Sequence, residues 1–262
     1  MGNPLILLII TIVFLSSQTI SLANESEETK FTYIKGAENG PERWGKLHTN
    51  YTICNAGNMQ SPINIDHSTV KITTKFGPLI RRYESAPAII VNQGHALQIK
   101  WTGDAGKIII NGTEYFLVQC HWHTPSENTV NGKKFDMEMH LVHMSAKDEI
   151  AAVSIFYEIG EPDRFLGQLL DSIKHVVDHN GKDLGVLNPR KIRYGSKKYY
   201  RFIGSLTTPP CSQGVIWTVI KKTKTLSQEQ INLLKEAVDD GYEENARPVQ
   251  PLNGRTVYLN IP

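Results

Sequence analysis

The feature that most constrains the fold is a series of short runs rich in β-branched and aromatic residues. Such residues favour extended strands, and runs separated by turn-forming residues are typical of antiparallel sheets. Asn-Gly pairs at 111–112 and 131–132 mark tight turns between some of these runs. The runs span residues 88–91, 96–101, 107–110, 115–122, 135–143, 150–157, 215–220 and 256–259. The sequence therefore predicts a mainly β protein.

Two segments depart from this pattern and predict helices. The first, residues 162–178, begins at a proline and carries apolar residues at helical spacing, namely Phe165, Leu169, Ile173 and Val176. In the second, Ser227 and Gln230 form a capping box that opens a helix directed toward Gly241. Because no repeat or linker-like tract divides the chain, residues 24–262 are expected to form one domain.

The first residues have the composition of a signal peptide. Residues 1–23 contain no charged side chain, and Ser21-Leu22-Ala23 has the small-x-small pattern of a cleavage site. The apolar part is too short to cross a bilayer, so the mature chain is expected to lack a membrane span. Its net charge of +2 is spread over separate lysine pairs, which argues against a nucleic-acid partner. We expect entry into the secretory pathway, with oligomeric state left open.

Three cysteines in an exported chain allow one disulfide and one free thiol. Cys120 lies within a strand-like run, whereas Cys54 and Cys211 lie in loop-like surroundings, so we predict a bond between Cys54 and Cys211. Asn50 and Asn111 each begin an Asn-x-Thr sequon, and both are candidate glycosylation sites of an exported protein.

Two neighbouring runs bring three histidines together. Side chains alternate across a strand, so His121 and His123 share one face with Gln119 and Leu117. In the next run, residues Glu138, His140 and Val142 share a face. If the runs pair as antiparallel strands, His140 lies beside the other two histidines.

A lone histidine on a sheet is usually an ordinary core or surface residue, but three on one face are better explained by a metal ion. Three histidines without a carboxylate favour Zn²⁺ with an open fourth position, the arrangement of a catalytic site. Gln119 and Glu138, each two residues before a candidate ligand, could accept the second ring N–H. A cupin is the competing metal fold, because Glu127 follows His121-x-His123, but Tyr115 and Lys134 replace its glycines.

With these residues in view, the chain resembles the α-class carbonic anhydrases of plants, from Phe31 to the C-terminus. The resemblance is carried by an ordered series of motifs: Gly40-Pro41-Glu42 with Trp44, residues 60–65 (QSPINI), residues 92–95 (NQGH), Gln119-x-His121-x-His123, Ser126-Glu127, Glu138-x-His140-x-Val142-His143, residues 204–210 (GSLTTPP), and residues 245–252 (NARPVQPL).

The resemblance implies a twisted, mainly antiparallel ten-stranded sheet with a few short peripheral helices and a Zn²⁺ ion held by His121, His123 and His140. It implies a zinc lyase that hydrates CO2 reversibly to bicarbonate and a proton, by attack of zinc-bound hydroxide. Thr207 would orient the hydroxide, Glu127 would accept from Thr207, and His95 would carry the proton. The polar wall would contain Thr208, Gln93 and Gln98, and the CO2 pocket would contain Val142, Leu206 and Trp217. Extracellular members also have a disulfide that matches Cys54 and Cys211.

Two departures from the family pattern concern residues near the ligands. Asn128 stands where a histidine usually follows the glutamate, so we expect altered stability or rate without loss of activity. Cys120 replaces a bulkier apolar residue, but strand parity turns it away from the zinc. The main alternative is a storage or binding protein of the same family with weak catalysis, and a zinc peptidase is disfavoured because the ligands lie on strands. Plant relatives are either secreted or reach the chloroplast by the secretory route.

Overall fold

The computed structural model describes residues 30–176 and 181–262. The predicted signal peptide, residues 1–23, and the end of the predicted helix at 177–178 lie outside the described residues. Within the described ranges, no helix is both long and apolar enough to cross a membrane.

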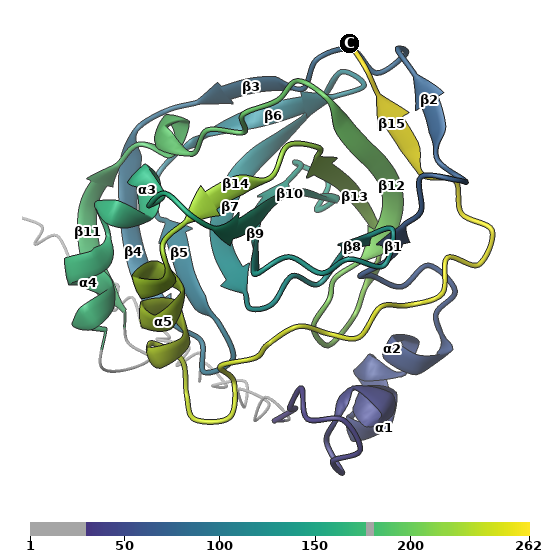
Figure 1. Ribbon diagram of the computed structural model, residues 1–262, viewed down its shortest axis with the longest axis horizontal. Helices are drawn as coiled ribbons and strands as arrows, with labels where there is room; N and C mark the ends of the chain where they lie inside the picture. Colours follow the sequence, from purple (N-terminus) through teal and green to yellow (C-terminus); the bar gives the residue numbers. More distant parts are fainter. Residues whose placement is uncertain (1–29, 177–180) are drawn as a thin grey trace, which may run out of the picture.

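A large curled sheet dominates the part of the chain that is described, and thirteen strands belong to it (Figure 1). Ten of them follow one continuous path in the order β11 (Lys182–Leu187), β4 (Ala86–Asn92), β5 (Leu97–Trp101), β7 (Thr113–His123), β9 (Met137–Met144), β10 (Ile150–Ile159), β13 (Gln213–Ile220), β12 (Tyr199–Ser205), β15 (Tyr258–Asn260) and β2 (Lys71–Thr73). The others are β3 (Ile80–Tyr83), β6 (Gly106–Ile110) and β14 (Lys224–Leu226). A separate pair joins β1 (Asn64–Ile65) to β8 (Thr129–Val130).

Most neighbouring strands are antiparallel, as predicted, and each of the eight predicted runs overlaps a strand. The parallel neighbours in the large sheet are β10 with β13, β10 with β14, and β15 with β2, and the separate pair of β1 and β8 is parallel as well. The mixed sheet thus agrees with a mainly antiparallel fold, and the continuous path has the ten strands that the resemblance implied.

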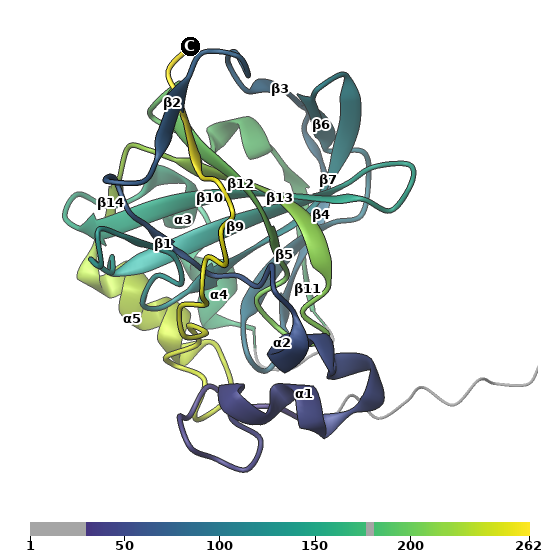
Figure 2. The ribbon, with the colours of Figure 1, turned by 90° about the vertical axis from the view of Figure 1, so that its right-hand side faces the viewer.

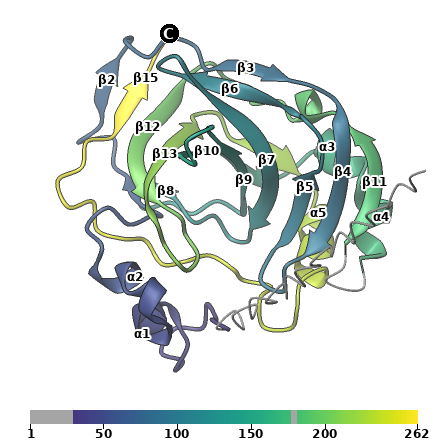
Figure 3. The ribbon, with the colours of Figure 1, turned by 180° about the vertical axis from the view of Figure 1, so that it is seen from behind.

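Helices are short and lie around the sheet. Near the N-terminus the chain forms η1 (Pro41–Arg43), α1 (Trp44–Leu47), η2 (Thr49–Tyr51) and α2 (Ile53–Ala56). Figure 2 shows α1 and α2 at the opposite end of the molecule from β2 and β3. The later helices are α3 (Arg164–Gly167), α4 (Leu170–Lys174), η3 (Pro189–Lys191) and α5 (Gln228–Glu236). Figure 3 shows α4 and α5 beside the edge formed by β4, β5 and β11.

The prediction of one continuous helix over residues 162–178 is wrong, because the structure has two short helices there, α3 and α4. The apolar stripe is buried as expected, but the helix breaks between α3 and α4. The Leu169 N–H donates to the Leu166 carbonyl, three residues back, so the chain tightens there instead of continuing as an α-helix. The second prediction is confirmed at its start, where Ser227 and Gln230 form the capping box of α5, although the helix ends at Glu236.

Two buried apolar clusters occupy different parts of the sheet. The larger contains Cys120, Trp122, Met139 and Leu141, together with apolar residues of α3, α4 and α5. The smaller contains Phe156, Phe202 and Trp217. Since side chains alternate along β7 and β9, packing Cys120 and Trp122 into the larger cluster turns His121 and His123 to the opposite face.

A β-bulge in β7 makes one predicted position wrong. Leu117 pairs with His143, whereas Gln119 pairs with Val142, so Val118 is the extra residue between them. The extra residue reverses the side-chain alternation before Gln119. Leu117 therefore packs in the larger apolar cluster instead of sharing a face with the histidines.

Candidate metal centre and active site

The antiparallel pairing of β7 with β9 brings the three predicted ligands together. His121 is directly opposite His140, and His123 is two residues along the same face of β7. One ligand atom from each ring lies within 4.8 Å of the others. The ring centroids are 4.7 to 5.3 Å apart.

The other nitrogen of each ring lies against an oxygen. His121 Nδ1 is 2.8 Å from Gln119 Oε1, and His123 Nδ1 is 2.8 Å from the backbone oxygen of Asn245. His140 Nε2 lies 3.0 Å from Glu138 Oε1. These contacts orient the rings and leave His121 Nε2, His123 Nε2 and His140 Nδ1 for a common partner.

Burial and protonation both suit a metal ion at this point. His123 Nε2 is buried and has no hydrogen-bond partner among the described residues, an unfavourable state unless something binds it. Burial lowers the pKa of His121 well below its ordinary value and that of His123 to about 3, with the neighbouring rings adding to the effect. The His121 and His123 rings are thus neutral at physiological pH, as a metal ligand must be. A set of three imidazole ligands fits Zn²⁺.

Glu138 is held by a buried hydrogen-bond network that includes Asn128. The backbone N–H groups of Glu127 and Asn128 each donate to Glu138 Oε2 at 2.8 Å. Asn128 Nδ2 donates to Glu138 Oε1 at 2.7 Å, and the Ser154 hydroxyl donates to the same oxygen. Burial alone would raise the Glu138 pKa, but His140 and these donors hold it below its ordinary value. Glu138 is therefore an ionised acceptor beside His140.

Asn128 also accepts, because its Oδ1 receives the Ile63 N–H at 3.0 Å. Both ends of this side chain, which is fully buried, are thus satisfied. The asparagine connects the carboxylate beside His140 to the segment that leads into β1.

Glu127 lies on the metal-facing side of the histidines and is completely buried. Its Oε1 accepts from the Arg247 N–H at 2.9 Å, and its Oε2 lies 3.5 Å from His123 Nε2. Burial raises the Glu127 pKa to about 7, although nearby His140, the Arg247 N–H and the Thr207 side chain each act to lower it. The Thr207 side chain thus lies within hydrogen-bonding reach of Glu127.

The predicted apolar wall is brought together in part. The Trp217 ring lies 4.8 Å from the His140 ring, edge to face, and its Nε1–H donates to the Ser205 carbonyl at 3.0 Å. Leu206 packs against the same apolar cluster as Trp217. Val142 is partly buried on β9, two residues after His140.

The residues predicted to line the polar side of the site, and the predicted proton carrier His95, lie at different places relative to the three histidines. Gln98 of β5 is directly opposite His121, so it lies on the site. Gln93 is exposed in the turn between β4 and β5. Thr208 lies in the turn before Cys211, where its carbonyl accepts the Cys211 N–H at 2.8 Å. His95 is half-buried in the same turn as Gln93, with its ring 5.1 Å from that of Phe31 and outside the metal cluster.

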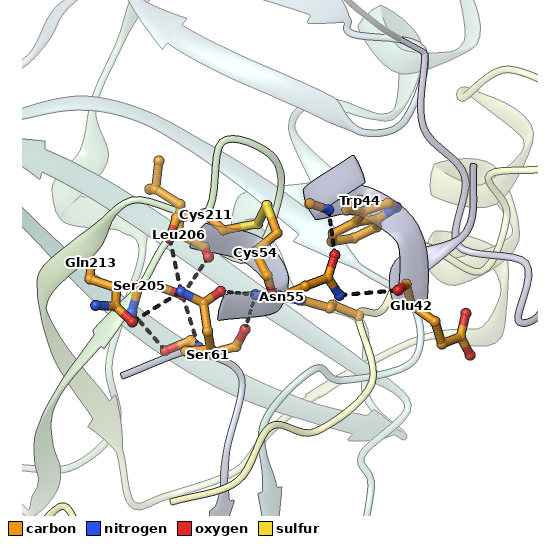
Figure 4. The surroundings of a disulfide bond; sticks show 12 residues. Glu42, Trp44, Cys54, Asn55, Ser61, Ser205, Leu206, Cys211 and Gln213 are labelled. Atoms are coloured by element: carbon orange, nitrogen blue, oxygen red, sulfur yellow. Dashed lines mark hydrogen bonds between the residues drawn. A yellow bond between two sulfur atoms is a disulfide. The ribbon is translucent and has the colours of Figure 1, made fainter. Parts of the chain in front are cut away.

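The predicted disulfide is confirmed. Cys54 and Cys211 are bonded, with Cα atoms 5.0 Å apart, and the bond joins α2 to the loop that follows Thr207 and Thr208 (Figure 4). Cys120 is the free cysteine and is buried. The sequon residues Asn50 and Asn111 are both exposed.

Two residues that position the site, Asn245 and Arg247, had no role that could be predicted from the sequence. Asn245 accepts from His123 through its backbone oxygen, and its side chain bonds Thr124 N and the carbonyls of His95 and Trp122. Arg247, which is 1% exposed, donates from its guanidinium to Gln60 Oε1 and to the Ser61 and Cys54 carbonyls. Both residues belong to the motif at 245–252, which was the only signal, because their partners are distant in the sequence and only the fold brings them together.

A comparison with family models agrees with this site. The model of the eukaryotic-type carbonic anhydrases matches residues 39–261, which include all three histidines. The chain belongs to this family.

Curated relatives of the same family match over nearly the whole chain. Alpha carbonic anhydrase 4 of Arabidopsis thaliana is 48% identical over 252 residues, covering 95% of this chain and 94% of the relative. Carbonic anhydrase Nec1 of Nesocodon mauritianus is 42% identical and covers 97% of this chain and 93% of the relative. The chain is therefore a member of an enzyme family, and the likeness is not confined to the histidine motif.

Solved structures support the fold. The structure of dioscorin complexed with ascorbate has a TM-score of 0.86 and 41% identity, covering 88% of this chain and 97% of that chain. The α-carbonic anhydrase of Thermovibrio ammonificans, in complex with the inhibitor sulfanilamide, has a TM-score of 0.78 and 33% identity, with 88% and 99% covered.

Proposed function

We propose that the protein is a zinc enzyme that hydrates CO2 reversibly to bicarbonate and a proton. The observation that carries this proposal is the convergence of three imidazoles whose ligand atoms lie within 4.8 Å of one another, each with its other nitrogen against an oxygen. Family membership supplies the reaction, since the carbonic anhydrases are named for it.

His121, His123 and His140 would hold Zn²⁺. The ion would make a nucleophile available from water at neutral pH, an effect for which carbonic anhydrase is the standard example. Gln119, the Asn245 carbonyl and Glu138 would fix the ring orientations and tautomers. Glu138 would also increase the basicity of His140, because an ionised acceptor strengthens the donor ability of the metal-bound nitrogen.

Thr207 and Glu127 would orient the attacking oxygen. In its ionised form Glu127 accepts a hydrogen bond from the Thr207 hydroxyl, which leaves the Thr207 oxygen free only to accept. A reacting group that donates to Thr207 is then held in one orientation with a lone pair toward the substrate carbon. Arg247 keeps Glu127 in place through its backbone N–H.

Val142, Leu206 and Trp217 would hold CO2, a small molecule with no net dipole, beside the nucleophile. An apolar wall suits this substrate better than the charged product, so it favours release of bicarbonate. Thr208, Gln93 and Gln98 would line the polar side. His95 would take up the released proton and pass it to buffer, since an imidazole exchanges protons readily near neutral pH.

We also propose that the protein follows the secretory pathway after removal of residues 1–23, with glycans at Asn50 and Asn111. The disulfide between Cys54 and Cys211 is compatible with an oxidising compartment. Secretion and delivery to the chloroplast by the secretory route both agree with these features.

A matched pair of threonine variants tests the proposed roles. We expect Thr207→Val to lower the CO2 hydration rate of zinc-loaded protein by about 100-fold, because it removes both the donor to Glu127 and the acceptor for the nucleophile. Thr208→Val, in the adjacent position, is expected to have an effect of less than about tenfold. Stopped-flow hydration with a pH indicator measures both. Equal rates for the two variants would contradict the assignment of Thr207.

The second candidate function is ligand binding with weak catalysis. It is favoured by the likeness to dioscorin, whose solved structure contains ascorbate. Calorimetric titration with ascorbate distinguishes the two functions: ascorbate binding by zinc-loaded protein that does not accelerate CO2 hydration would favour the binding protein.

A further inference from the structure

A basic hollow lies outside the candidate active site, where three separated segments meet. It has a volume of about 550 Å³ and is lined by the start of α3, the end of η3 with the loop after it, and the turn between β13 and β14 with the start of β14. In Figure 1 these segments lie near the labels of α3 and β14. None of the residues assigned to the zinc centre lines it.

Cationic side chains dominate the lining of this hollow. Five of its residues are basic and one is acidic: the cations are Arg164, Lys191, Arg193, Lys222 and Lys224, and the acid is Asp163. Asp163 is already satisfied, because it pairs with Lys224 and its Oδ1 accepts the N–H groups of Phe165 and Leu166 at the start of α3. The net charge of the lining is therefore positive.

Four of the five cations have no intramolecular counterion among the described residues. Among the residues that the structure describes, Arg164, Arg193 and Lys222 make no ion pair, and all three side chains are exposed. Lys191 bonds only a neutral group, Gln168 Oε1, at 2.8 Å. Grouping unpaired like charges is unfavourable by itself, and an anion bound among them relieves that repulsion.

The hollow is built on an ordered framework. The Lys221 N–H donates to the Lys198 carbonyl at 3.0 Å, which ties the β13–β14 turn to the start of β12. The Lys222 side chain crosses Gly195, where an added Cβ would lie 3.3 Å from Lys222 Cδ. Buried Asp163 is also fixed through Gln230 Oε1, which accepts its N–H at 2.8 Å. The cations thus project from positions that tertiary contacts define.

We propose that this hollow binds a small molecule that carries several phosphate or sulfate groups. Its volume is within the range of small-molecule sites, about 300 to 1000 Å³. Two guanidinium groups can each bind an oxyanion with paired N–H donors, and the lysines add charge without a fixed geometry. The site is independent of the proposed zinc chemistry.

Calorimetric titration with inositol hexasulfate tests the proposal, with uncharged inositol as the matched probe. The test variant is Arg193→Gln/Lys222→Gln. The control variant, Lys100→Gln/Lys147→Gln, removes the same charge from exposed positions that do not line the hollow. We expect binding of the hexasulfate to weaken about tenfold in the test variant and less than about twofold in the control. Added salt should weaken binding to the wild type.

Binding of inositol hexaphosphate in the same assay separates the two oxyanions. Tighter binding than that of the hexasulfate, lost in the test variant, would assign a phosphate ester, and the reverse order would assign a sulfate ester. No binding of either molecule, or equal weakening in the test and control variants, would overturn the proposal. CO2 hydration should be unchanged in the test variant, so failure here is distinguishable from failure of the proposed enzyme function.

Discussion

Asn128→Ala is the substitution that most directly tests the buried network behind the metal centre. Asn128 is fully buried and connects Glu138 to the backbone of Ile63. Truncation removes a donor to an ionised carboxylate and an acceptor from a buried N–H. Alanine cannot replace either group, and Glu138 keeps only its contacts with Ser154, His140 and the two backbone N–H groups.

The expected cost follows from these two bonds. A hydrogen bond to a charged group contributes about 1.5 to 3 kcal/mol, and a buried N–H left without a partner costs about 1 to 3 kcal/mol. Allowing for partial access of water to the cavity, we expect Asn128→Ala to lower the free energy of unfolding by about 3 to 5 kcal/mol.

Urea unfolding followed by circular dichroism measures this difference, with the exposed Asn232→Ala as a control expected to change stability by less than about 0.5 kcal/mol. A double-mutant cycle with Ser154→Ala adds a sharper test, since both side chains donate to Glu138 Oε1 and their effects should not add. A loss below about 1 kcal/mol with an unchanged denaturant slope would refute the reasoning.

Two further predictions concern stability. Replacing Cys54 and Cys211 by serine opens a loop of 157 residues, which should lower the free energy of unfolding by about 5 kcal/mol in the chain-entropy model. The same urea midpoint for the oxidised wild type and the variant would contradict this. Burial lowers the pKa of His143 to about 4, so the folded state binds fewer protons than the unfolded state between about pH 4 and 6.5. Stability should therefore fall as the pH is lowered through this range, with about 2 kcal/mol lost from this group between pH 7.5 and 5. The His143→Gln variant should lose correspondingly less over the same interval, and an equally steep fall would be evidence against this role.

The metal ligands could be predicted from the sequence, because the alternation of side chains along a strand decides on which face each residue lies. The parity of β7 and β9 was enough to place His121, His123 and His140 on one face, and the strand pairing agrees with it. The same rule failed at Leu117, because an extra residue in β7 reverses the alternation and bulges have no reliable sequence signal.

Strands without alternation were harder to predict. β12 is buried along nearly its whole length, so its burial does not alternate between an inner and an outer face, and it was not predicted. β11 was missed as well, and its pairing with β4 shifts between Asp183 and Val186.

Contacts between distant segments could not be read from the chain. The role of Asn245 depends on a backbone oxygen, and any residue has one. The lysine pairs at 197–198 and 221–222 look like separate solvated positions in the sequence. Only the fold joins them, through the bond between Lys221 and Lys198.

The most direct test of the proposed enzyme is the rate of CO2 hydration by the purified, zinc-loaded protein beside its His140→Ala variant. Zinc content is determined on the same samples. We predict one zinc per chain and rapid hydration in the wild type, with both reduced in the variant because one of three ligands is lost. Full zinc loading of the wild type with hydration no faster than the uncatalysed reaction would contradict the account.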